Sequence, residues 1–260
     1  MRTVKEIYEA VKIIAPETMA YEWDHIGLLC GHFDREVTRV LVALDPFLPV
    51  CMEAKKLGCQ LLLTHHPAIW DLKAVNDATP AGRVLLYLAE NGIAAINAHT
   101  NLDCAPGGVN DCLAAALALQ NTHIIDPRES DGRSYGLLRG GTVAQTDAKT
   151  LAAHVKRCLH CAGLRYVDGG KPITRVAVGG GACGEELFRV AALGYDAFIT
   201  ADIKYNGFFD AQSLGVTPID AGHFQTENPV CAYLADTVRT RFPELEIFLS
   251  KTHRDCIIFA

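Results

Sequence analysis

The chain has 260 residues, half of them hydrophobic and 21% charged, which is enough for one large folded domain or two small ones. It contains no run of 18 or more apolar residues, and charges interrupt its N-terminal segment, so we expect no membrane span, no export and a cytoplasmic location. The net charge of −6 makes nucleic acid an unlikely main partner, because a phosphate backbone attracts positive charge.

The first half of the chain alternates short apolar runs with helix-like stretches. Residues 38–42 form the first run, a helix-like stretch ends at Gly58, and further runs follow at 61–64 and 92–98. Short strands separated by helices that end in glycine are typical of parallel βαβ units. The pattern therefore predicts strand, helix, strand, helix, strand.

The second half repeats this order, with apolar runs at 174–178, 197–200 and 215–221. The spacing from the first run to the glycine after its helix is 19 positions in both halves, from Arg39 to Gly58 and from Arg175 to Gly194. We therefore predict an internal duplication that forms two three-layer α/β lobes, residues 1–127 and 128–260, with a C-terminal segment that can pack on the first lobe.

Histidine and carboxylate side chains follow the predicted strands, at the sheet edge where ligands usually bind. Imidazole and carboxylate together suit zinc, iron or manganese. A tetrahedral catalytic ion takes about three protein ligands, so a larger set favours two divalent ions. Each residue alone could instead be a buried core histidine or a helix cap. The candidate ligands are His65, His66, Asp103, His223 and Glu227, which lies four positions after His223.

Other polar residues near these predicted loops allow two interpretations. Asp24, Asp45 and Asn101 can cap helices or orient the metal ligands through hydrogen bonds. His99 and Lys204 allow the same interpretation, but they can also be catalytic. In that case His99 is a general acid or base and Lys204 contacts an anionic substrate.

Two further motifs have weaker support. Residues 179–184 match G-x-G-x-x-G between a strand and a helix, but no second half of a dinucleotide fold follows, so we expect a tight turn or a phosphate-binding helix start. Cys158 and Cys161 form C-x-x-C inside a helix-like stretch, without a second cysteine pair nearby. We expect the ten cysteines to be mainly small buried thiols.

Several segments resemble the Nif-three-like family, whose bacterial YbgI-like members are often labelled GTP cyclohydrolase I type 2 homologues. The matching segments are residues 23–28, 63–67, 98–103, 199–205 and 222–227. The resemblance implies two similar, intertwined α/β/α domains with a dinuclear metal site between them, the same five ligands, and a ring-shaped homohexamer. Ala201 and Asn206 depart from the family pattern, in which glycine and histidine are usual at these positions.

These observations favour a dinuclear metal-dependent hydrolase that acts on a nucleotide or another small phosphorylated or heterocyclic substrate. The alternative is a non-enzymatic metal carrier, sensor or regulatory binding protein.

Overall fold

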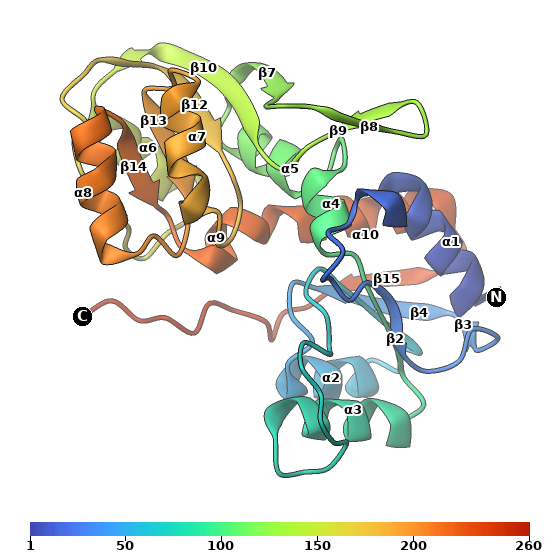
Figure 1. The fold of residues 1–260 in the computed structure, drawn as a ribbon. Coiled ribbons are helices and arrows are strands. Elements are labelled where there is room, and N and C mark those ends of the chain that lie inside the picture. Colours follow the sequence, from blue (N-terminus) through green and yellow to red (C-terminus); the bar gives the residue numbers. More distant parts are fainter. The chain divides into compact units, whose positions relative to one another are not determined.

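The computed structural model describes all 260 residues and divides into two compact units, each shown in Figure 1. Unit 1 comprises residues 1–108 and 230–254, and unit 2 comprises residues 109–229 and 255–260. The chain thus leaves unit 1, builds most of unit 2 and returns. This division differs from the expected boundary at residue 127, because the segment after residue 108 already packs within unit 2 and the segment after residue 229 pairs within unit 1.

Unit 1 contains a five-stranded sheet in the order β15-β4-β5-β6-β2. The first four strands are parallel to their neighbours, and β2 pairs with β6 in the antiparallel direction. A separate two-stranded ribbon joins β1 and β3. The strands are β1 (Arg2–Thr3), β2 (Gly27–Cys30), β3 (Glu36–Val37), β4 (Arg39–Ala43), β5 (Leu61–Thr64), β6 (Ala94–Asn97) and β15 (Glu246–Leu249).

The helices of unit 1 cover both faces of this sheet. In Figure 1, α2 and α3 lie on one side and α1 lies on the other. Residues of α2 and α3 form an apolar cluster with Leu41 and Leu62, which point to the same face of the sheet. The helices are α1 (Val4–Ile14), the short 3-10 helix η1 (Glu17–Met19), α2 (Leu48–Lys56), α3 (Pro80–Glu90), α4 (Thr100–Cys104) and α10 (Pro229–Arg241).

Unit 2 contains a six-stranded sheet in the order β11-β14-β13-β12-β10-β7. Its strands β12, β13 and β14 are parallel, and the other three pair in the antiparallel direction. The strands are β7 (Gln120–Ile124), β10 (Arg139–Thr146), β11 (Arg165–Tyr166), β12 (Ile173–Val178), β13 (Ala197–Thr200) and β14 (Thr217–Asp220), with a hairpin of β8 (Arg128–Ser130) and β9 (Arg133–Tyr135) outside the sheet.

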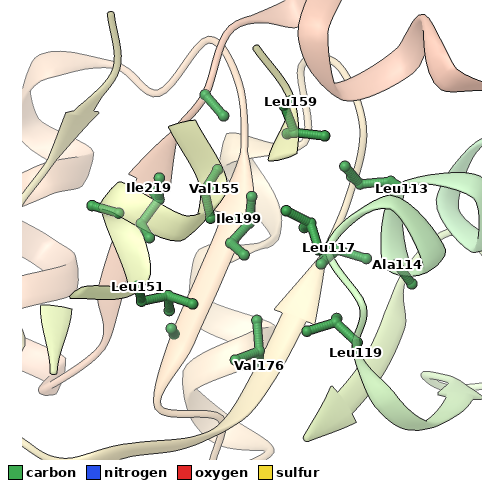
Figure 2. Packing of buried hydrophobic residues seen from close by; sticks show 14 of the residues in the cluster. Leu113, Ala114, Leu117, Leu119, Leu151, Val155, Leu159, Val176, Ile199 and Ile219 are labelled. Atoms are coloured by element: carbon green, nitrogen blue, oxygen red, sulfur yellow. The ribbon is translucent and has the colours of Figure 1, made fainter. Parts of the chain in front are cut away.

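Helices also cover both faces of the second sheet. Figure 2 shows Leu113 and Val155 packed with Val176 and Ile199 on one face. On the other face Phe198 packs with residues of α7 and α8. The helices are α5 (Val109–Ala116), α6 (Ala148–Cys158), the 3-10 helix η2 (Gly184–Glu186), α7 (Leu187–Ala192), α8 (Tyr205–Leu214) and α9 (His223–Glu227). The expected α/β fold class is confirmed.

The two units share one strand order, as the duplication predicts. The parallel strands β4, β5 and β6 of unit 1 follow the same succession as β12, β13 and β14 of unit 2. In both units the chain leaves the second and third of these strands at the same sheet edge. The candidate ligands of each unit lie directly beyond that edge.

Candidate metal centre

His65 and His66 follow β5 and are both buried. The His65 Nδ1 lies 2.9 Å from the Ala98 carbonyl oxygen. The His66 Nδ1 lies 2.7 Å from Asp45 Oδ1. The Thr64 hydroxyl donates to the His66 carbonyl at 2.7 Å, which fixes the turn after the strand. Both imidazoles are therefore held by their Nδ1 atoms, which places the lone pair on Nε2 for binding a metal.

His99 joins the same cluster from the end of β6. Its Nδ1 lies 2.8 Å from Asp24 Oδ1, and Asp24 Oδ2 also accepts bonds from the main chain and hydroxyl of Thr100. Burial raises the pKa of the Asp24 carboxyl, but the bonds from His99 and Thr100 outweigh it and lower this pKa to about 2. One ligand atom each of His65, His66 and His99 lies within 4.8 Å of the others, so the three imidazoles can hold a metal ion.

Asp103 adds a carboxylate to the three imidazoles. It lies one turn after His99, to whose carbonyl its N–H donates at 3.0 Å. Its Oδ1 is 3.6 Å from His65 Nε2, and the residue is buried. Imidazole and carboxylate donors suit zinc, iron or manganese, and the Asp103 carboxylate lies beside one of the three clustered imidazoles, so the unit 1 residues fit a divalent ion.

Asp45 connects the cluster to the C-terminal part of unit 1. Its second oxygen accepts from His253 Nε2 at 2.8 Å, while its first accepts from His66. Burial raises the pKa of Asp45, but the bonds from the two imidazoles hold this pKa well below its usual range. Asp24 and Asp45 thus orient His99 and His66 through hydrogen bonds, one of the two interpretations that the sequence allowed.

Unit 2 presents a second histidine and carboxylate pair on α9. His223 and Glu227 are four residues apart and share one face of the helix, with His223 Nε2 3.0 Å from Glu227 Oε2. His223 Nδ1 lies 2.7 Å from Asp202 Oδ2. Asp202 follows β13 in the left-handed conformation, with φ of 53°. His223 is therefore oriented by a carboxylate, as His66 and His99 are in unit 1.

The glycine-rich loop after β12 lies directly against the Glu227 side chain. A Cβ on Gly181, whose φ is +65°, would lie 2.0 Å from Glu227 Oε1. The Gly181 N–H donates to Thr226 Oγ1 at 3.0 Å, and the Gly180 N–H donates to Asn110 Oδ1 at 2.7 Å. These two N–H groups are engaged within unit 2. The loop therefore matches the expected tight turn, and it lets the Glu227 carboxylate approach the main chain.

Lys204 and the C-x-x-C pair have surroundings of their own. Lys204 is exposed, and its Nζ contacts Glu185 Oε1 at 2.8 Å; its role as a substrate contact stays a prediction.

Cys161 Sγ donates to the Ala221 carbonyl at 3.3 Å, and burial raises the pKa of this thiol to about 11. Cys158 Sγ contacts the ring of His154. Six of the ten cysteines are buried, as expected for core thiols.

The sequence patterns missed two aromatic groups and one histidine. His253 reaches Asp45 only because β15 returns beside β4, and no local motif announces that pairing. Trp23 and Trp70, the two tryptophans of the chain, both meet His99 edge-on, with ring centroids 6.1 and 5.0 Å away. Both are more than half exposed. The position of Trp23 could have been inferred from the sequence, because this residue directly precedes Asp24.

Residues 2–256 match the family described as Duf34/NIF3 (NGG1p interacting factor 3). The chain belongs to this family. A "GTP cyclohydrolase 1 type 2 homolog" of Clostridium perfringens is 32% identical over 97% of both chains. One of Streptomyces coelicolor is 36% identical over 98% of this chain and 93% of its own. The resemblance noted from the sequence is thereby confirmed.

Solved structures related to this family share the fold. A Bacillus cereus protein related to NIF3 has a TM-score of 0.94 at 25% identity, covering 100% of this chain and 99% of its own. Reduced HcgD from Methanocaldococcus jannaschii has a TM-score of 0.80 at 30% identity, covering 96% and 98%. No helix of the structure combines the length and the apolar character needed to cross a membrane.

Proposed function

We propose that this NIF3-family protein is a metal-dependent hydrolase that binds two divalent ions through His65, His66, Asp103, His223 and Glu227. The observation that carries the proposal is the shared anchoring of the histidines. His65, His66 and His223 each engage a carbonyl or carboxylate through Nδ1, which presents Nε2 as the ligand atom. Anchoring through Nδ1 is typical of metal-binding histidines, because it fixes the ring and leaves Nε2 to bind the ion.

His99 is the proposed proton-transfer group. Its Nδ1 is held by the Asp24 carboxylate, which orients the ring. Divalent ions bound by the neighbouring ligands supply a lowered pKa for bound water and stabilise negative charge. Asp24 also accepts bonds from Thr100, so one carboxylate both orients the ring of His99 and holds the first residue of α4.

The substrate class is a nucleotide or another small phosphorylated or heterocyclic compound. Relatives named "GTP cyclohydrolase 1 type 2 homolog" support this class, and so does a 28% identical Helicobacter pylori protein named "GTP cyclohydrolase 1 type 2". The zinc, iron or manganese preference of imidazole and carboxylate ligands agrees with hydrolytic chemistry. A ring-shaped homohexamer is part of the proposal, and native mass spectrometry tests it.

The deciding experiment combines metal content with turnover. Protein purified without added metal or chelator is analysed for zinc, iron and manganese, and metal-reconstituted protein is screened against nucleotides and phosphoesters. We expect two equivalents of metal and a metal-dependent turnover that His66→Ala abolishes. His32→Ala, which alters an exposed histidine of the same unit, serves as the control. Absence of metal-dependent turnover, or turnover unchanged in His66→Ala, rules out the hydrolase.

A non-enzymatic metal carrier or sensor is the second candidate. The exposure of part of the His223 side chain favours it, because a carrier must release its metal to a partner. This function predicts metal transfer to an apo acceptor protein without turnover of any substrate. His99→Gln separates the two functions. If the protein is a hydrolase, this variant should keep its metal and lose turnover. If the protein is a carrier, the variant should transfer metal like the unaltered protein.

A further inference from the structure

A cavity of about 420 Å³ lies beside the histidine cluster within unit 1. It is bounded by residues 45–49 at the start of α2, by the turn after His66 and by residues 80–84 at the start of α3. Its volume lies in the range of roughly 300–1,000 Å³ that is typical of small-molecule sites. The cavity is therefore large enough for a ring compound with a charged substituent.

Two residues belong both to the cavity wall and to the surroundings of the cluster. Asp45 lines the cavity and binds His66 Nδ1 at 2.7 Å. Trp70 lines it as well, and its ring centroid lies 6.1 Å from that of His66 and 5.0 Å from that of His99. A molecule in the cavity thus lies next to the groups proposed to bind metal and transfer protons.

The wall combines aromatic rings with one guanidinium group and one carboxylate, that of Asp45. The side chains of Phe47 and Trp70 are 57% and 56% exposed, so a planar ring can cover apolar surface that water now contacts. Arg83 supplies a guanidinium, whose five N–H donors match phosphate oxygens. The helices α2 and α3 both begin in this wall, which adds the positive ends of two helix dipoles.

Prolines make this wall rigid before any ligand arrives. Four of them line the cavity, and each fixes its own φ angle. Their positions at the starts of α2 and α3 and directly after His66 hold the aromatic rings on a preformed surface. A preformed site loses little conformational entropy on binding. The four residues are Pro46, Pro49, Pro67 and Pro80.

We infer that this cavity binds a nucleoside monophosphate or a similar phosphorylated planar heterocycle, with the ring against Trp70 and the phosphate at Arg83. The inference rests on the proposed function and identifies a substrate subsite for it. A second cavity, of about 520 Å³ in unit 2, is less suited to a phosphate. It is lined by three carboxylates and one ammonium group, those of Glu185, Asp202, Asp210 and Lys204.

Calorimetric titration of the chelator-treated protein tests the subsite without turnover. The probes are adenosine and guanosine 5′-monophosphates, the free nucleosides and ribose 5-phosphate. We expect the monophosphates to bind best, with about tenfold weaker binding in Trp70→Leu, from lost stacking, and in Arg83→Gln, from the lost phosphate contact. Phe33→Leu and Lys56→Gln, which alter exposed residues outside the cavity wall, should bind like the unaltered protein.

The outcomes separate this inference from the proposed function. Binding that depends on Trp70 and Arg83 in a protein without turnover supports the subsite and rules out the hydrolase. Turnover that depends on His66 but is indifferent to both substitutions overturns the subsite and leaves the hydrolase in place. Equal affinity for ribose 5-phosphate and the monophosphates, or no binding at millimolar concentration, also overturns it.

Discussion

Gln60 and Asp196 occupy the same position in the two units and accept the same hydrogen bonds. Each side-chain oxygen receives three bonds of 2.8–3.2 Å. The donors are the main chain and hydroxyl of a threonine and the main chain of the arginine after it, Thr38 and Arg39 in unit 1 and Thr174 and Arg175 in unit 2. The duplication thus preserved this set of hydrogen bonds between neighbouring strands. The accepting side chain is a neutral amide in unit 1 and a carboxylate in unit 2.

This difference in charge predicts different responses to acid. Burial raises the pKa of Asp196, but the bonds from Arg175 and Thr174 outweigh it and lower this pKa. A lowered pKa in the folded state contributes stability above the unfolded value of about 4, and that contribution is lost as the pH falls through the folded value. Between pH 7 and pH 3, the unfolding free energy of Asp196→Asn should therefore fall by about 1 kcal/mol less than that of the unaltered protein. Urea denaturation at the two pH values measures this difference.

The reciprocal substitution provides the control. Gln60→Glu introduces a carboxylate at the equivalent acceptor position of unit 1. The unfolding free energy of this variant should become more sensitive to acid by a similar amount. If both variants respond to acid like the unaltered protein, the hydrogen bonds to the Asp196 carboxylate contribute nothing to acid denaturation.

The close approach of Glu227 to Gly181 predicts a steric effect on metal binding. In Gly181→Ala the new Cβ would lie 2.0 Å from Glu227 Oε1 at a φ of +65°, so the carboxylate or the loop must move. We expect a loss of about 2–4 kcal/mol in unfolding free energy together with weaker metal binding. Denaturation and metal titration measure the two effects.

Gly170→Ala separates steric clash from backbone strain. Gly170 has a φ of +75°, but a Cβ there meets nothing within 4 Å. The unfolding free energy of this variant should fall by only about 1 kcal/mol, the cost of placing an alanine in the left-handed conformation. Its metal affinity should be unaltered. Equal behaviour of the two variants would show that Glu227 tolerates the extra methyl group.

The bond from His66 to Asp45 predicts an effect on metal affinity without loss of a ligand. Asp45→Asn keeps the shape of the side chain but removes the negative charge that orients the imidazole. Loss of such a partner typically lowers metal affinity about 10- to 100-fold. Competition with a fluorescent chelator measures the change. Asp147→Asn, at the cap of α6, should destabilise the fold slightly and leave metal affinity unaltered.

The cysteines predict a simple order of reactivity. Cys256 is exposed, whereas burial raises the pKa of Cys51 and Cys59 to about 12, which suppresses the reactive thiolate. At pH 8, iodoacetamide followed by mass spectrometry should modify Cys256 first, and Cys256→Ser should remove the fastest phase. Equal early modification of Cys51 would contradict the buried position of that thiol.

Much of the fold follows from the sequence because it is encoded locally. Apolar runs such as 61–64 and 197–200, each preceded by a helix that stops at glycine, specify buried parallel strands. The equal spacing from Arg39 to Gly58 and from Arg175 to Gly194 reveals the duplication. The sequence also placed His65 and His66 beyond a strand end, since ligands collect at that edge.

Only the tertiary structure decided which groups surround those histidines. Asp45 and His253 are more than 200 positions apart, and they meet because β15 pairs with β4, a contact that no local pattern encodes. The division of the chain at residue 108 depends on the same return of the C-terminal segment. Local spacing determined the strands and the candidate ligands, whereas long-range pairing determined the hydrogen bonds that orient the ligands and the cavity beside them.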